Sequence, residues 1–146
     1  MSTITLRQWA EQTKERLEAV QRRSIELLGD EMTRTKANGG RVPVDTGNLA
    51  RSLLASQQAM PKTSDTVPSG MDIGAFAATM DVSKATWLGY QSRYARRVNS
   101  GFVGADSLGR VFNQQGQHFV EGAAAEWQNI VNRAIADVKA TSKPSK

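Results

Sequence analysis

Residues 5–32, TLRQWAEQTKERLEAVQRRSIELLGDEM, decide the fold of this chain. Apolar or small side chains recur there every three or four residues, as on one face of an α-helix: Leu6, Trp9, Ala10, Thr13, Leu17, Val20, Ser24, Leu27, Leu28 and Met32. Thr5 precedes Gln8 by three residues, which is the spacing of a capping box at a helix start. Residues 38–40, Asn-Gly-Gly, are typical of a helix end.

A helix of about 30 residues is roughly 45 Å long, which is long for so small a domain. We therefore expect either a sheet laid along the helix or a neighbouring subunit in an assembly. The apolar stripe from Leu6 to Met32 is expected to be mostly core, with an interface role for whatever remains uncovered.

The other end of the chain has the same period. Apolar side chains recur at helical spacing and predict a helix over about 118–140: Val120, Ala123, Ala124, Trp127, Ile130, Val131, Ala134 and Val138. Residues 141–146 are polar and are expected to form a frayed tail. The sequence thus predicts one domain over residues 1–140.

Between these helices the pattern is of short elements. Pro43 favours an extended backbone, and Asp45 or Thr46 can cap a helical turn over 48–52. Strands are predicted at 53–58 and 84–90, and short helices at 72–82 and 93–99. Glycine, proline, serine and threonine predict loops at 60–71 and 100–116. The expected fold class is α+β: a long N-terminal helix, a small antiparallel sheet with short connecting helices, and a long C-terminal helix.

The composition indicates a polar globular domain with a thin core. Of 146 residues, 39% are hydrophobic and only nine are aromatic, and such a core often gains stability from neighbouring subunits. The net charge of +5 is spread along the chain, which argues against a dedicated basic arm. An ordinary basic soluble protein and a surface near DNA both fit this charge.

Chemistry-bearing patterns are scarce, so we predict no enzyme, no cofactor and no metal. The chain has no cysteine and a single histidine. His118 and Glu121 have the spacing of half a metal site, but a site needs three or four ligands. No serine lies in the Gly-x-Ser-x-Gly motif that positions a hydrolase nucleophile. No glycine-containing stretch fits the P-loop pattern or the dinucleotide-binding fingerprint. The sequence carries no signal-peptide core or membrane span, so we expect a soluble, intracellular protein.

A basic cluster surrounds Tyr94. Arg93, Arg96 and Arg97 could contact phosphate or could form a subunit contact, and the nearby aromatic residues favour the subunit contact. The candidates for facing DNA are Arg93 and the Arg22–Arg23 pair.

The segment Val42–Leu53, VPVDTGNLARSL, resembles the P-V-D-T-G-x-L-x-x-S signature of phage neck and tail-completion proteins, the group related to minor tail protein Z. Members commonly open with a long helix before that signature. They continue with a Tyr-Ala-x-x-Val-x-x-Gly element, similar to residues 94–101 here, and with Phe-Val-x-x-Ala before the last helix, similar to residues 119–123. The resemblance covers nearly the whole chain in order and spacing.

Two places depart from the pattern. Many relatives have Glu-x-Gly-Thr after the Tyr-Ala element, where this chain has residues 99–102, Asn-Ser-Gly-Phe. Many also have Pro-Arg before the phenylalanine, where this chain has Gln117-His118. Both places are expected to be contact loops. The resemblance therefore indicates the family more closely than it indicates which ring of the particle this chain contacts.

The resemblance implies a non-enzymatic subunit of a tailed-phage virion, forming a ring at the head–tail junction through which the genome passes. The expected partners are further copies, six by the symmetry of such tails, and neighbouring head–tail connector, tail terminator or tail tube proteins. The protein would be made in the host cytoplasm and end in the neck of the virion. Two surfaces are expected to form subunit contacts, the turn of Asp45, Thr46, Gly47, Asn48 and Leu49 and the element of Tyr94, Arg96, Arg97 and Phe102.

Alternatives remain at this point. The Asp45–Gly47 turn could merely start a helix that locks the long helix to the sheet. The chain could belong to another ring of the same particle, such as the tail terminator, the head-closure protein or the portal adaptor. It could also be a small basic DNA-binding protein, whose free monomer would bind DNA with steep salt dependence. A small enzyme has no supporting set of residues.

Overall fold

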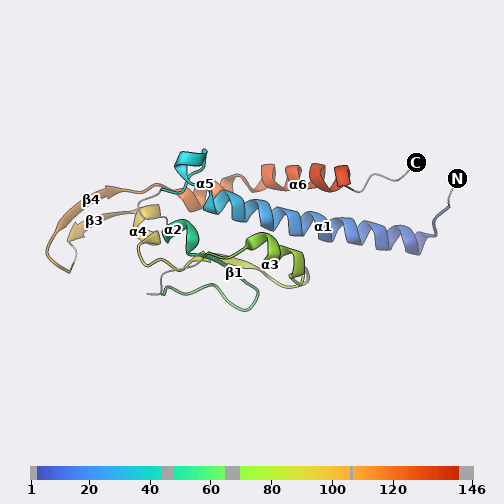
Figure 1. Cartoon of the computed structure of the whole chain (residues 1–146), viewed down its shortest axis with the longest axis horizontal. Coiled ribbons are helices and arrows are strands. Elements are labelled where there is room, and N and C mark those ends of the chain that lie inside the picture. The colour runs from blue at the N-terminus through green and yellow to red at the C-terminus, as the bar shows by residue number, and fades with distance from the viewer. Residues whose placement is uncertain (1–2, 44–47, 65–69, 106, 142–146) are drawn as a thin grey trace.

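The computed structural model describes residues 3–43, 48–64, 70–105 and 107–141. Its longest element is helix α1, Leu6–Thr33 (Figure 1). The predicted capping box is confirmed. Thr5 Oγ1 accepts a hydrogen bond from the Gln8 amide at 3.2 Å, and Gln8 Oε1 accepts one from the Thr5 amide at 2.9 Å. These two bonds satisfy amides that have no partner inside the first turn of a helix.

The helix ends earlier than residues 38–40 predict. After Thr33 the chain turns through a short 3₁₀-helix, η1, Lys36–Asn38. Gly39 then takes a left-handed backbone conformation with φ of 80°, and the Gly40 amide returns to the Thr35 carbonyl at 2.8 Å. The glycines thus end η1 and turn the chain, while α1 stops at Thr33.

The middle of the chain folds as the α+β class requires. The elements in order are α2 (Asn48–Arg51), β1 (Leu53–Ser56), α3 (Ile73–Thr79), β2 (Trp87–Tyr90) and α4 (Ala95–Ser100). Strands β1 and β2 pair antiparallel, with Leu53 opposite Tyr90 and Ser56 opposite Trp87. Each of these elements lies within or overlaps a segment for which its type was predicted.

The prediction of a loop over 100–116 is wrong. Strands β3 (Gly101–Ala105) and β4 (Val111–Gln115) form an antiparallel hairpin, with Phe102 opposite Gln114 and Ala105 opposite Val111. Glycines suggested a loop here, but two of them serve the hairpin. Gly101 (φ 85°) begins β3 and Gly109 (φ 78°) lies in the turn, both in the left-handed region that glycine adopts without strain.

The predicted C-terminal helix is broken in two. Helix α5 spans Phe119–Ala125, and α6 spans Trp127–Thr141. At the break, the Glu126 amide bonds the Ala123 carbonyl at 3.1 Å, a tight turn of the 3₁₀ kind. The break lets Phe119 and Ala123 enter different core clusters from Ile130 and Ala134. Residues 142–146 of the predicted tail lie outside the described residues.

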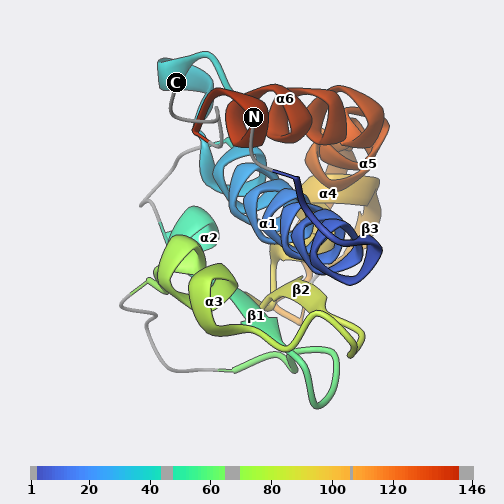
Figure 2. The same cartoon turned by 90° about the vertical axis from the view of Figure 1, so that its right-hand side faces the viewer.

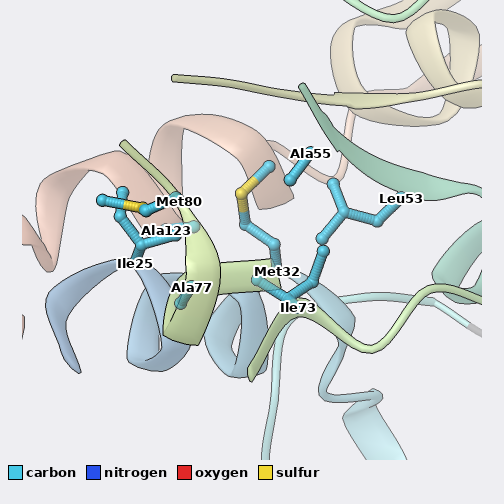
Figure 3. Packing of buried hydrophobic residues seen from close by; sticks show 8 residues of the cluster. All are labelled: Ile25, Met32, Leu53, Ala55, Ile73, Ala77, Met80 and Ala123. Atoms are coloured by element: carbon cyan, nitrogen blue, oxygen red, sulfur yellow. The ribbon is translucent and has the colours of Figure 1, made fainter. Parts of the chain in front are cut away.

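Helix α1 is the middle layer of the molecule. Viewed along the long axis, α6 lies on one side of α1, and α3 with β1 and β2 lies on the other (Figure 2). The main core packs between α1, α3 and the first sheet (Figure 3). It contains Ile25, Met32, Leu53, Ala55, Ile73, Ala77, Met80 and Ala123. Gly29 is buried in α1, and a Cβ at that position would lie 2.6 Å from Ile73 Cγ2.

The expectation that the α1 stripe is mostly core holds for its C-terminal half, and the N-terminal half is the part left uncovered. Ser24, Ile25, Leu27, Gly29 and Met32 are the buried residues of the helix. Leu6 is 81% exposed, Trp9 56% and Leu17 65%. The N-terminal half of α1 extends beyond the sheet and α3 (Figure 1), so the described part of the chain leaves these apolar side chains exposed.

Candidate assembly surfaces

The first predicted contact surface is largely internal where it can be described. Asp45, Thr46 and Gly47 lie outside the described residues. Asn48 is partly buried, and Leu49 is 4% exposed. The Leu49 side chain belongs to a cluster with Val42, Ala95 and Phe119. Leu49 is therefore a core residue of this subunit and presents little surface to another.

The second predicted surface is more open. Tyr94 is 43% exposed, and the Arg96 side chain is exposed on α4. The Arg97 guanidinium lies over the Phe102 ring, 4.1 Å from its centroid, and this cation–π contact ties α4 to the start of β3. Arg97 is thereby held at the base of the hairpin with its charge still near solvent.

The structure brings the two predicted surfaces together. Leu49 of α2 and Ala95 of α4 share one buried cluster, with Val98 packed against it. The two surfaces were predicted to be the two different faces that each subunit uses in a ring. They instead form one end of the molecule, beside which the β3–β4 hairpin begins (Figure 1).

Of the three arginines predicted to face DNA, two make contacts between helices of this chain and the third is exposed. The Arg22 guanidinium donates to the carbonyls of Ala77 at 2.9 Å and Met80 at 2.7 Å. The Arg23 guanidinium donates to Asp137 Oδ2 at 2.9 Å and pairs with Glu26 at 3.1 Å. The hydrogen bond to Asp137 is the main cause of a raised pKa of Arg23. Both side chains thus hold α1 to α3 and α6, whereas Arg93 is exposed beside α4.

The hairpin carries an apolar surface that sequence reasoning missed. Val103 is 78% exposed, Val111 82% and Leu108, in the turn, 75%. Val103, Ala105 and Val111 lie on one face, because side chains alternate along a strand and Ala105 stands opposite Val111. The aromatic and β-branched pairs Phe102-Val103 and Val111-Phe112 are a weak strand signal in the sequence, and the glycines outweighed it.

A second exposed apolar surface is the first half of α1, with Leu6, Trp9 and Leu17 on one stripe. This stripe and the hairpin lie at opposite ends of an elongated molecule (Figure 1). Soluble monomers rarely expose large contiguous apolar patches, and such patches mark contact sites. The arrangement can therefore make two different contacts at once, one at each end.

One place where the sequence departs from the neck-protein pattern has an internal role here. Asn99 is buried, and its Oδ1 accepts the Val120 amide at 2.9 Å while its Nδ2 donates to Glu121 Oε1 at 3.0 Å. Asn99 thus caps α5 in place of His118, which precedes the helix in a left-handed conformation with φ of 49° and makes no side-chain cap. A hydrogen bond from its own backbone amide, then the Asn99 bond, lower the pKa of Glu121.

A hollow of about 300 Å³ lies between α1 and the α5–α6 break. Asp30, Glu31, Arg34, Glu126 and Arg133 are among its lining residues. Glu31 contacts Arg34, and Arg41 joins Glu31 at 3.4 Å to Glu126 at 3.1 Å. These ion pairs connect the turn after α1 to the break and give the hollow a structural role.

Over the described ranges, no group of three or more His, Cys, Asp or Glu side chains is placed to hold a metal ion. None of the helices described is both long and apolar enough to cross a membrane. Comparison of the chain with protein-family models, with curated proteins and with solved structures finds no match.

Proposed function

We propose that this chain is a non-enzymatic structural subunit of a tailed-phage particle. It would assemble into a ring at the head–tail junction, as a neck or tail-completion protein, and the genome would pass through that ring. The observation that carries the proposal is the pair of exposed apolar surfaces at opposite ends of one elongated subunit. The order of the three sequence motifs, at residues 42–53, 94–101 and 119–123, is what points to phage rather than to another assembly.

Two different surfaces on one subunit are what a ring requires. A contact between unlike surfaces repeats from copy to copy, and it closes into a ring when the rotation between copies divides a full turn. Six copies would match the symmetry of such tails. The net charge of +5 would tolerate DNA in the channel. Neighbouring rings, such as connector, tail terminator or tail tube proteins, would be the other partners in the virion after assembly in the host cytoplasm.

The test is size-exclusion chromatography with light scattering on the full chain, alone and with purified tails that lack their end. A ring-sized species, or a monomer captured by those tails, is the expected result. A monomer that ignores tails and binds duplex DNA at moderate salt would overturn the proposal and favour the DNA-binding alternative. In a parallel run with purified heads, capture by heads and not by tails would assign the chain to a different ring of the particle.

A further inference from the structure

We propose that the β3–β4 hairpin of one copy packs on the projecting N-terminal half of α1 of the next copy. This contact rests on the self-association that the proposed function requires, and it identifies the two surfaces that meet. The contact surface of the hairpin is the face of Val103, Ala105 and Val111 with Leu108 at the tip. The contact surface of α1 is the stripe of Leu6, Trp9 and Leu17.

The described residues of the chain leave one face of the hairpin uncovered. Strands β3 and β4 form a two-stranded sheet separate from that of β1 and β2. An isolated two-stranded hairpin is marginally stable in water, and it gains stability when a helix covers its apolar face. Phe102 is on the face that contacts Arg97, so the opposite face, with Val103 and Val111, is the uncovered one.

The α1 stripe continues a helix contact that already exists in the chain. Leu27 packs with Ile130 and Ala134 of α6, and Val20 lies against the same cluster. Helix α6 ends at Thr141, whereas the stripe runs on through Leu17 and Trp9 to Leu6. Residues 142–146, Ser-Lys-Pro-Ser-Lys, are polar, a composition poorly suited to covering an apolar stripe.

The two surfaces match in length. From Leu6 to Leu17 a helix rises about 17 Å. Each strand of the hairpin has five residues, and at the usual rise a strand of that length spans about 17 Å. One hairpin therefore covers the stripe from end to end.

The charges favour contact between unlike ends. Residues 91–117 carry four arginines, Arg93, Arg96, Arg97 and Arg110, and a single acidic residue, Asp106, so the hairpin end has a net charge of +3. Two hairpin ends would therefore repel each other. The projecting half of α1 has no net charge, because Arg7, Lys14 and Arg16 balance Glu11, Glu15 and Glu18, whose spacing places them on the side of the helix away from the apolar stripe. A basic hairpin therefore meets less repulsion on α1 of a second copy than on another hairpin.

A disulfide-trapping experiment tests the contact, because the chain has no cysteine of its own. Trp9→Cys and Leu108→Cys chains are mixed in equal amounts under the conditions in which the wild type associates, alone or on tails, and then oxidised. A cross-linked pair containing one chain of each kind is expected. The matched control replaces Trp9→Cys with Gln58→Cys, an exposed position next to β1, and should give little of the mixed pair.

A second variant, Leu6→Ser with Trp9→Ser and Leu17→Ser, should keep the wild-type unfolding temperature because these side chains are exposed. Its association should weaken about tenfold or more, whereas Gln12→Ser should change neither quantity. If the wild type associates but the mixed pair forms no faster than the control, this contact is wrong and the proposed function stands. If the wild type does not associate alone or with tails, the proposed function fails as well. Should the triple variant fold poorly, the cysteine pair alone decides.

Discussion

The Tyr90 hydroxyl donates a hydrogen bond of 2.6 Å to the main-chain carbonyl of Met32. Met32 lies in the last turn of α1, where carbonyls have no partner inside the helix. The Tyr90 ring also meets the Phe119 ring edge-on, with centroids 5.2 Å apart. One side chain of β2 thus joins the end of the long helix to α5.

Burial raises the pKa of Tyr90, which makes stability depend on alkaline pH. The neutral phenol is favoured in the folded state, so its contribution is complete below the unfolded pKa of about 10. As pH rises above that value, the unfolded state releases the proton first and stability falls. We expect urea unfolding between pH 8 and 11 to show this fall in the wild type and in Tyr94→Phe. In Tyr90→Phe the part of this fall that Tyr90 causes should disappear. An unchanged alkaline fall in stability in Tyr90→Phe would show that another group causes it.

Gly29→Ala should destabilise the fold. The added Cβ would lie 2.6 Å from Ile73 Cγ2 and 2.9 Å from Ile73 Cβ, so α1 and α3 must separate. Overpacking of this kind costs about 1–3 kcal/mol in the free energy of unfolding. Gly74→Ala is the control, because its added Cβ would meet no atom closer than Asp72 Oδ1, at 3.3 Å. Equal unfolding free energies for the two variants would show that the α1–α3 contact is looser than described.

Asn99→Ala should cost about 1–2 kcal/mol, because it removes the cap of α5 and leaves the Val120 amide without that acceptor. Chemical denaturation measures the loss. Asn129→Ala, which removes an exposed bond to Glu126, should stay within about 0.5 kcal/mol of wild type. An unchanged free energy of unfolding for Asn99→Ala would show that the two hydrogen bonds of Asn99 do not stabilise α5.

Arg22→Ala should destabilise the chain by about 1–3 kcal/mol, since hydrogen bonds from charged groups are among the stronger ones. It leaves the carbonyls of Ala77 and Met80, both on buried residues, without their guanidinium donor. Arg16→Ala, on the exposed half of α1, should change the unfolding free energy little. If Arg22→Ala instead keeps full stability and weakens DNA binding, the predicted DNA-facing role of Arg22 would be the better account.

The sequence by itself was enough for features that depend on neighbours along the chain. The capping box of Thr5 and Gln8, the helical turn at α2 and the α+β class follow from spacing and local backbone preference. The same local signals failed at residues 101–115. Glycine favours loops in general, but here the pairing of two strands decided the conformation.

Tertiary structure alone decided which parts of these elements face solvent. Leu17 and Leu27 stand on one helical stripe, yet the first is exposed and the second buried, because Ile130 and Ala134 of α6 pack against Leu27. Leu49 is a core residue because α4 and α5 meet over it. Arg22 reads as a surface charge in the sequence, but α3 brings two carbonyls to it. Periodicity determines which side chains share a face, and only packing between distant segments determines where that face is covered.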